Sequence, residues 1–163
     1  MAKAAAWTIR IRDYKAADAP AIVRLFFDTV RTVNRKDYSE EQVEAWAPGV
    51  PDPEEWHARM KSRNTLVAEE DGGVVGFAEL EGDGHLDMLY VREGAVGRGV
   101  GRLLYEAIER EARGKGLGRI FTEASITARP FFERQGFRVM REQTVLRRGT
   151  RLTNFVMQKN LIG

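Results

Sequence analysis

The segment that most constrains the fold of this chain is a glycine-rich turn, Val96-Gly97-Arg98-Gly99-Val100-Gly101-Arg102, which joins an apolar, strand-like run to a strongly patterned helix. Its three glycines remove Cβ atoms, so that backbone N–H groups can converge on a ligand. The following helix directs its unpaired first-turn N–H groups and the positive end of its dipole at the same place. The turn is therefore predicted to bind an anion, and a pyrophosphate fits it best.

Three kinds of ligand-binding loop could account for the sequence of this turn. A P-loop has the spacing of Gly94 and Gly99 but needs a lysine and a hydroxyl residue next, and the chain has neither. A dinucleotide fingerprint fits Gly97 and Gly99, with Glu123 as its acidic residue, but Arg102 stands at the third glycine position and a polar loop precedes the turn. A coenzyme A pyrophosphate loop tolerates both departures. A glycine-rich turn without any ligand is the remaining alternative.

Length and composition favour one globular domain over residues 1–163. Hydrophobic residues make up 43% and charged residues 31%, a balance that builds a core and excludes a disordered chain. No apolar run reaches the roughly 18 residues that a bilayer requires. The absence of cysteine excludes disulfides, thiolate metal sites and a cysteine acyl-enzyme. We therefore expect a cytoplasmic protein without a metal site.

The charge pattern argues against a nucleic-acid partner. The net charge is only +2, and basic residues alternate with acidic ones along the predicted helices. A nucleic-acid-binding domain concentrates its basic residues on one face. We therefore expect no nucleic-acid partner and no membrane partner.

Hydrophobic periodicity predicts a mixed α/β layout. The first strand is expected at 7–12, followed by a helix that Asp18 caps and that runs to about 33, and by a second helix from the Ser39-Glu40-Glu41-Gln42 capping box. A third helix carries Trp56 and Met60. The rest of the pattern predicts strands at 65–69, 74–80 and 85–91, a helix from 100, a strand at 119–124, a short helix at 127–135 and a strand pair that turns at Arg148-Gly149.

Three segments together resemble the GNAT acetyltransferase superfamily: Asp87-Met88-Leu89-Tyr90-Val91, the glycine-rich turn, and Ala128-Arg129-Pro130-Phe131-Phe132-Glu133-Arg134-Gln135-Gly136-Phe137. More narrowly, Tyr38-Ser39, Gln42-Val43, Ala45-Trp46-Ala47, 123–137 and Thr153-Asn154-Phe155 are similar to its YafP-like branch. The resemblance implies a central, mostly antiparallel sheet of six to seven strands, flanked by helices and splayed between the fourth and fifth strands.

The same resemblance implies acetyl-CoA as cosubstrate. The pyrophosphate would bind the glycine-rich turn, and the pantetheine arm would lie along the fourth strand where it separates from the fifth. The positions expected to contact the cofactor are Leu89, Tyr90, Val91, Val96, Gly97, Arg98, Gly99, Val100, Gly101, Arg102, Ser125, Thr127, Pro130 and Phe132.

Asp87 is the first candidate for accepting the amine proton. It stands in an otherwise apolar strand, where a charge is costly unless it is hydrated, paired or functional. Some GNAT enzymes place a catalytic glutamate at the matching position. The alternative is that Asp87 pairs with His85 or a backbone group. Glu79 is the second candidate, although its alternating pattern also suits a solvent-facing residue, and water could carry the proton instead.

The chain departs from the family at Phe132, where many members carry a tyrosine that protonates the leaving thiolate. Ser125 and Tyr90 are candidate hydroxyl substitutes, and Tyr105 is expected at the margin of its helix. A thiolate with a pKa near ~8.5 is weakly basic, so amides near Thr127 could stabilise it without a dedicated acid.

The predicted reaction is direct transfer of acetyl from acetyl-CoA to an amine, in a ternary complex, by a monomer or homodimer. The acceptor is expected to be a small molecule held by Asn34, Tyr38, Trp46, His85 and Asn154, with Trp56 and His57 as further candidates. Two alternatives remain open: an acyl-CoA sensor without catalysis, suggested by Phe132, and a dinucleotide-dependent oxidoreductase, suggested by Gly97, Gly99 and Glu123.

Overall fold

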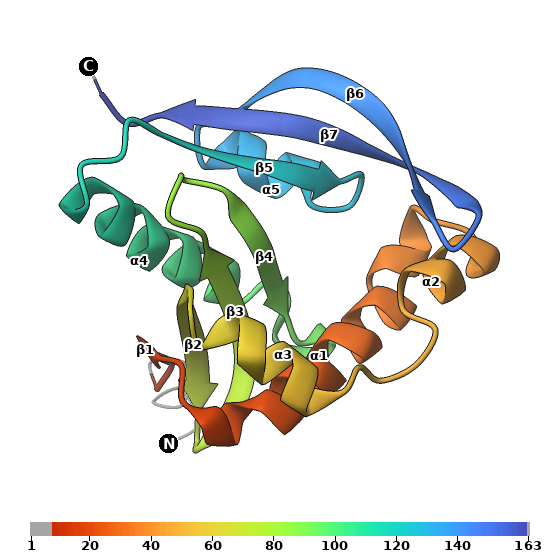
Figure 1. The fold of residues 1–163 in the computed structure, drawn as a ribbon, viewed down its shortest axis with the longest axis horizontal. Helices are drawn as coiled ribbons and strands as arrows, with labels where there is room; N and C mark the ends of the chain where they lie inside the picture. The colour runs from red at the N-terminus through yellow and green to blue at the C-terminus, as the bar shows by residue number, and fades with distance from the viewer. Residues whose placement is uncertain (1–7, 163) are drawn as a thin grey trace.

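A computed structural model describes residues 8–162, in which seven strands form two antiparallel sheets (Figure 1). The first sheet has the order β1-β2-β3-β4, with β1 at Arg10–Asp13, β2 at Asn64–Glu70, β3 at Gly73–Leu80 and β4 at Leu86–Val91. The second has the order β5-β7-β6, with β5 at Arg119–Ser125, β6 at Arg138–Arg147 and β7 at Thr150–Asn160. The expected mixed, mostly antiparallel architecture is confirmed.

The helices fall close to the predicted segments. They are α1 at Ala19–Thr32, α2 at Glu40–Trp46, α3 at Pro53–Met60, α4 at Val100–Gly114 and α5 at Arg129–Arg134, with 3-10 turns η2 at Ala16–Asp18, η3 at Asn34–Lys36 and η4 at Glu93–Ala95. The late helix is shorter than expected, and Trp7 of the predicted first strand lies outside the described residues. Within residues 8–162, none of the helices is long and apolar enough to cross a membrane.

The two predicted helix caps differ in outcome. The Ser39 capping box is confirmed, because its hydroxyl accepts from Gln42 N at 3.1 Å and Gln42 Oε1 accepts from Ser39 N at 2.8 Å. Asp18 occupies the N-cap position of α1, but its carboxylate accepts no N–H of that helix. Instead it binds the Arg12 guanidinium and the N–H of Lys15, so its role in capping α1 was wrongly predicted.

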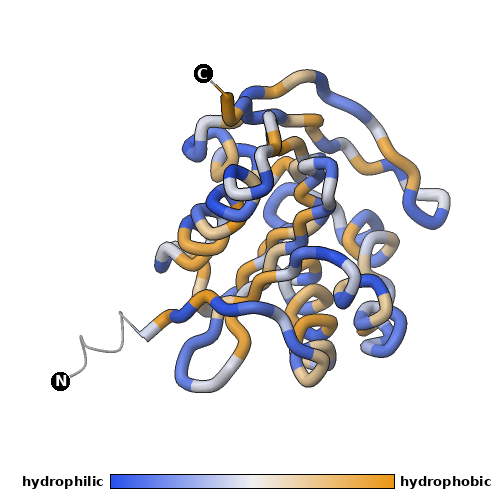
Figure 2. Tube along the Cα trace, turned by 60° about the vertical axis from the view of Figure 1, so that its left-hand side comes forward, coloured by the Kyte–Doolittle hydropathy of each residue, from blue (hydrophilic) through white to orange (hydrophobic). Residues whose placement is uncertain are grey.

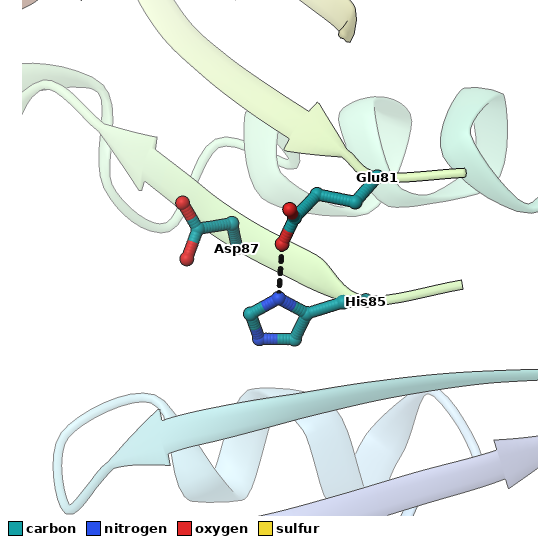
Figure 3. Close-up of side chains that lie close together, drawn as sticks. All are labelled: Glu81, His85 and Asp87. Atoms are coloured by element: carbon teal, nitrogen blue, oxygen red, sulfur yellow. Dashed lines mark hydrogen bonds and ion pairs between the residues drawn. The ribbon is translucent and has the colours of Figure 1, made fainter. Parts of the chain in front are cut away.

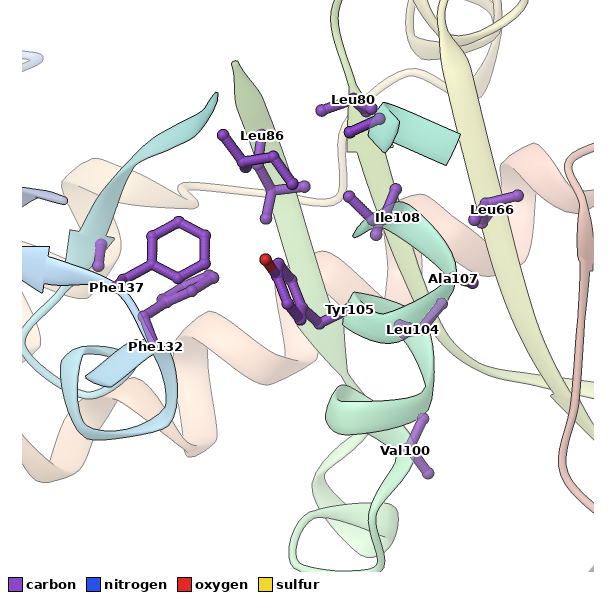
Figure 4. Packing of buried hydrophobic residues seen from close by; sticks show 14 of the residues in the cluster. Leu66, Leu80, Leu86, Val100, Leu104, Tyr105, Ala107, Ile108, Phe132 and Phe137 are labelled. Atoms are coloured by element: carbon purple, nitrogen blue, oxygen red, sulfur yellow. The ribbon is translucent and has the colours of Figure 1, made fainter. Parts of the chain in front are cut away.

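Two hydrophobic clusters cover opposite faces of the first sheet. One packs α4 and the second sheet against it, and the other packs α1, α2 and α3 against it. Figure 2 shows apolar residues along the inner strands and the inward sides of the helices. Tyr105 of α4 is fully buried beside Phe137, in the first cluster rather than at the helix margin (Figure 4).

The two sheets meet at a single short junction. His85 and Phe121 form an isolated parallel bridge, and Phe121 N donates to Gly84 O at 3.0 Å. Thr122 Oγ1 adds a bond to Leu86 O at 2.8 Å. Gly84 has a φ of 98°, and a Cβ there would collide with the Arg119 carbonyl oxygen, so only glycine allows this approach. Beyond the junction β4 and β5 diverge (Figure 1), which confirms the expected splay.

Candidate active site

The splay opens into a cleft of about 610 Å³ between β4 and β5. One wall is Asp87 to Val91 of β4, and the other is the end of β5 with the start of α5. The glycine-rich turn closes one end, and Thr29, Asn34 and Trp46 line the α1 and α2 side. The chain thus brings the predicted cofactor and acceptor segments around one hollow.

Each glycine of the turn has its own structural reason. Gly97 and Gly99 adopt φ values of 86° and 87°, in the left-handed region that side chains disfavour. Gly99 is the N-cap of α4, so the N–H groups of the first turn start there. A Cβ on Gly101 would lie 3.2 Å from Phe131 Cε1, so this position lets α4 and α5 approach.

Two of the predicted cofactor positions face away from the cleft. Arg98 forms a two-pronged ion pair with Glu70, at 3.0 and 2.5 Å, which holds the turn against the end of β2. Val100 is buried in the core. Neither lines the cleft, so any contact of theirs with a ligand would come from the backbone. The lining includes all the other predicted cofactor positions, as well as Arg134, which was not predicted.

The late wall of the cleft carries two hydroxyls and an apolar ring. Ser125 Oγ accepts from Ala128 N at 3.0 Å and lies 3.5 Å from Asn34 Nδ2, so its own proton is not used in either bond. Thr127 Oγ1 is buried and has no partner among the described residues. Phe132 is 4% exposed and packs edge-on against Phe137. No hydroxyl stands where the family tyrosine would be.

Asp87 is the extra residue of a β-bulge. The register passes from Glu79 opposite Met88 to Leu80 opposite Leu86, which leaves Asp87 without a partner on β3. Its side chain is 30% exposed and lines the cleft, and its Oδ2 lies 3.1 Å from Arg63 Nη1. The predicted first base therefore reaches the cleft while one of its oxygens is engaged.

Glu79 is fully buried, which contradicts the solvent-facing interpretation. Its Oε2 pairs with Arg59 Nε at 3.3 Å and with Arg63 Nη1 at 3.2 Å. Its Oε1 has no partner within residues 8–162, and burial raises the pKa of this carboxyl. Glu79 does not line the cleft, so it cannot meet a substrate there directly.

His85 bridges the two sheets electrostatically. Nε2 bonds to Glu123 Oε1 of β5 at 2.7 Å, Nδ1 bonds to Glu81, and the ring stacks on Phe121. The bond to Glu123, with that to Glu81, raises the pKa of His85 to about 9 despite partial burial. His85 is thus a cation at neutral pH and serves the junction.

Glu81, His85 and Asp87 place potential metal-ligand atoms within 4.8 Å of one another (Figure 3). The charges of the two acids are already met by side chains, because Arg63 pairs with both and His85 is protonated between Glu81 and Glu123. A metal ion there would have to displace a proton from His85 and compete with Arg63. The geometry therefore favours an ion-pair network.

The acceptor candidates divide into two groups. Asn34 and Trp46 line the cleft, whereas Tyr38, His85 and Asn154 do not. The Tyr38 hydroxyl donates to Thr153 O at 2.6 Å and accepts from Ile126 N at 2.9 Å, so it ties the end of β5 to β7. The further candidates lie elsewhere too, since Trp56 packs on Phe26 and His57 bonds to Tyr14.

Arg63 is the residue at this site that the sequence patterns did not reveal. It lies in the turn between α3 and β2, outside any motif, and pairs with three acids from β3 and β4 and the turn between them. Its role depends on partners 16 to 24 positions away in the chain. No local pattern indicates such a pairing.

Comparison with known proteins identifies the family of this chain. The acetyltransferase (GNAT) domain family matches residues 34–159. YafP of Escherichia coli strain K12, an uncharacterized N-acetyltransferase, is 34% identical over 151 residues, which are 92% of this chain and 95% of YafP.

Solved structures agree. A GCN5-related N-acetyltransferase from Rhodopseudomonas palustris is 38% identical with a TM-score of 0.89, covering 94% of this chain and 96% of that one. The structure of YncA from Salmonella typhimurium with its cofactor acetyl-CoA shares the fold at 22% identity and a TM-score of 0.74, covering 95% of each chain. The chain belongs to the GNAT acetyltransferase family and is an N-acetyltransferase.

The His85 bridge predicts a pH-dependent stability. Because the folded pKa of about 9 exceeds the ordinary 6.5, the stabilisation is complete below about pH 6.5 and is lost as pH rises through 9. We expect wild type to lose about 1–2 kcal/mol more than His85→Gln between pH 6 and 9.5, after allowance for partial solvent screening. Urea unfolding at both pH values measures this. His57→Gln, whose ring bonds to Tyr14, should behave like wild type, and an equal loss in His85→Gln would contradict the prediction.

Proposed function

We propose that this enzyme transfers the acetyl group of acetyl-CoA directly to the amine of a small-molecule acceptor, in a ternary complex, with Asp87 accepting the amine proton. The observation that carries the proposal is the open splay of β4 from β5, which leads to a turn of left-handed glycines at the start of α4. The structure of YncA, which has the same fold, is described with acetyl-CoA as its cofactor.

In this proposal the backbone does most of the cofactor binding. The N–H groups of the glycine-rich turn and the first turn of α4 hold the pyrophosphate. Pantetheine lies along the edge of β4 that β5 leaves unpaired, as an added strand would. Arg102 and Arg134 line the cleft and supply positive charge for the phosphates. Thr127 Oγ1, buried without a partner, would gain one from the cofactor.

The chemistry needs one base and one oxyanion partner. The neutral amine attacks the thioester carbon, and N–H groups of β4 stabilise the developing oxyanion. As the C–S bond breaks, its electron pair passes to sulfur, and the amine proton passes to Asp87. Because Asp87 Oδ2 is paired with Arg63, the proton goes to Oδ1.

The thiolate leaves without a dedicated acid. Phe132 has no proton to give, and burial raises the pKa of the Tyr90 hydroxyl far above its usual value, which makes Tyr90 a poor donor. A thiolate with a pKa near ~8.5 is a good leaving group at neutral pH. The Ser125 hydroxyl proton, unused in its two bonds, is the competing source.

The surroundings of the acceptor end of the cleft support a small acceptor. The hairpin of β6 and β7 reaches over α2 (Figure 1), where Arg148 Nη1 donates to Ala45 O at 2.6 Å and Gln42 Nε2 donates to Arg151 O at 2.9 Å. Trp46 and Asn34 line the cleft on this side. A folded protein substrate would meet this hairpin beside the cleft.

Gly99→Asp is expected to abolish acetyl-CoA binding, because its side chain would enter the space of the pyrophosphate and repel it. Isothermal titration calorimetry measures the affinity. Gly116→Asp is the matched control: Gly116 has a similar φ of 73°, nothing lies within 4 Å of its Cβ position, and it lies at the other end of α4. Unchanged affinity in folded Gly99→Asp protein would contradict the proposed site.

Asp87→Asn is expected to lower kcat by roughly 10²–10⁴-fold, the usual contribution of a general base. The Kd for acetyl-CoA should change little, because the backbone supplies most of that binding. Steady-state kinetics with a panel of amines and a thiol-release assay test this, with Asp28→Asn on the exposed face of α1 as control. Activity within a few-fold of wild type across pH would assign the proton to water.

The donor-free departure of the thiolate predicts small effects at the two candidate donor positions. Phe132→Tyr should raise kcat at most about three-fold, and Ser125→Ala should lower it by less than about ten-fold, because the leaving group needs little help. The measurement is kcat with one working amine. A loss above about a hundred-fold in Ser125→Ala, with acetyl-CoA affinity intact, would make Ser125 the acid.

A further inference from the structure

One guanidinium, that of Arg63, pairs with three carboxylates of β3, β4 and the turn between them. Nη1 lies 3.1 Å from Asp87 Oδ2 and 3.2 Å from Glu79 Oε2, and Nη2 lies 3.3 Å from Glu81 Oε2. The side chain is 26% exposed, so solvent screens these pairs only in part. A planar fork with fixed N–H directions suits this role, which a lysine cannot reproduce.

The inner end of this network is anchored. Glu79 is fully buried on β3, and its Oε2 is shared between Arg63 and Arg59 of α3. Arg59 in turn stacks on Trp56 at 4.6 Å and has its Nη2 3.6 Å from Met88 Sδ. A buried ion pair with several partners holds its geometry tightly, because removing one partner is costly. Glu79 therefore fixes the position of the Arg63 guanidinium, which also contacts Asp87.

The pairing of Asp87 with Arg63 decides which of its carboxylate oxygens can accept a proton. Arg63 occupies Oδ2, so Oδ1 is the oxygen left for an amine in the cleft. When Asp87 becomes protonated it loses its attraction to Arg63, but Arg63 keeps Glu79 and Glu81. The proton transfer thus leaves no unpaired guanidinium in a partly buried place.

We propose that Arg63 is a positioning residue of the acetyl transfer, which holds Oδ2 of Asp87 and so aims its other carboxylate oxygen at the acceptor amine, with Glu79 as its buried anchor. This inference rests on the proposed role of Asp87 as base. It assigns a function to a residue that lies outside the sequence motifs of the family resemblance, and to the buried carboxylate that does not reach the cleft.

The test compares kcat, the KM for the amine and the affinity for acetyl-CoA in wild type, Arg63→Gln, Arg63→Lys and Arg59→Gln. Loss of the guanidinium in Arg63→Gln should lower kcat roughly 10–100-fold, with acetyl-CoA affinity within about two-fold. Arg63→Lys keeps a charged donor but not the planar fork, so it should recover only part of the lost kcat. Arg59→Gln, which loses a bond to Glu79 and none to Asp87, should lower kcat less than Arg63→Gln does.

A double variant separates positioning from stability. In the Asp87→Asn background, adding Arg63→Gln should change kcat by less than about three-fold, since Arg63 acts through Asp87. Full activity of Asp87→Asn alone would refute the proposed base.

An unchanged kcat in folded Arg63→Gln would overturn the role of Arg63 whatever acceptor the enzyme uses.

Discussion

β4 pairs with β3 along one edge, and most of its other edge has no partner strand among the described residues. Its side toward β3 carries an antiparallel ladder that is interrupted at the Asp87 bulge. Within the described residues, its hydrogen bonding to β5 is limited to the His85–Phe121 bridge and the bonds beside it. Backbone N–H and C=O groups without partners are costly when they are buried, so the free edge calls for a ligand that can pair with them. The cleft, the proposed pantetheine path and the reach of Asp87 all depend on this one divergence.

The junction itself is built so that the strands meet and then separate. Gly84 allows backbone contact with Arg119, and protonated His85 links acids on both sides. The Tyr38 hydroxyl fastens the other end of β5 to β7, so that the strand stays with the second sheet as it leaves β4. Both walls of the cleft are consequently held by contacts outside it, which leaves the lining free for ligands.

Charge is distributed unevenly along the cleft. Arg102 and Arg134 line it together with the glycine-rich turn, whereas Asp87 and Glu123 line it nearer the junction. An anionic cofactor and a cationic amine therefore meet complementary charge at different places. Arg63 pairs with Asp87 and His85 pairs with Glu123, and neither of these cations belongs to the lining. The orientation of both lining acids thus depends on residues that lie outside the cleft.

The sequence alone determined the features whose cause is local. The glycine-rich turn, the Ser39 capping box and the helical stripe of α4 follow from conformational limits and periodicity within a few residues, and each lies where it was predicted. The family resemblance added the splay between β4 and β5, which no local pattern would have revealed. Phe132 as the departure from the family pattern was also visible in the sequence.

Only the tertiary structure decided which charged side chains form ion pairs and which side chains are buried. Glu79 alternates like an exposed residue but is buried, because α3 and the turn after it bring Arg59 and Arg63 to it. Arg98 belongs to the predicted turn, yet it pairs with Glu70 on β2. Tyr38 was expected in the acceptor site and instead holds two strands. Burial and ion pairing depend on neighbours distant in the chain, and a linear pattern carries no record of those distances.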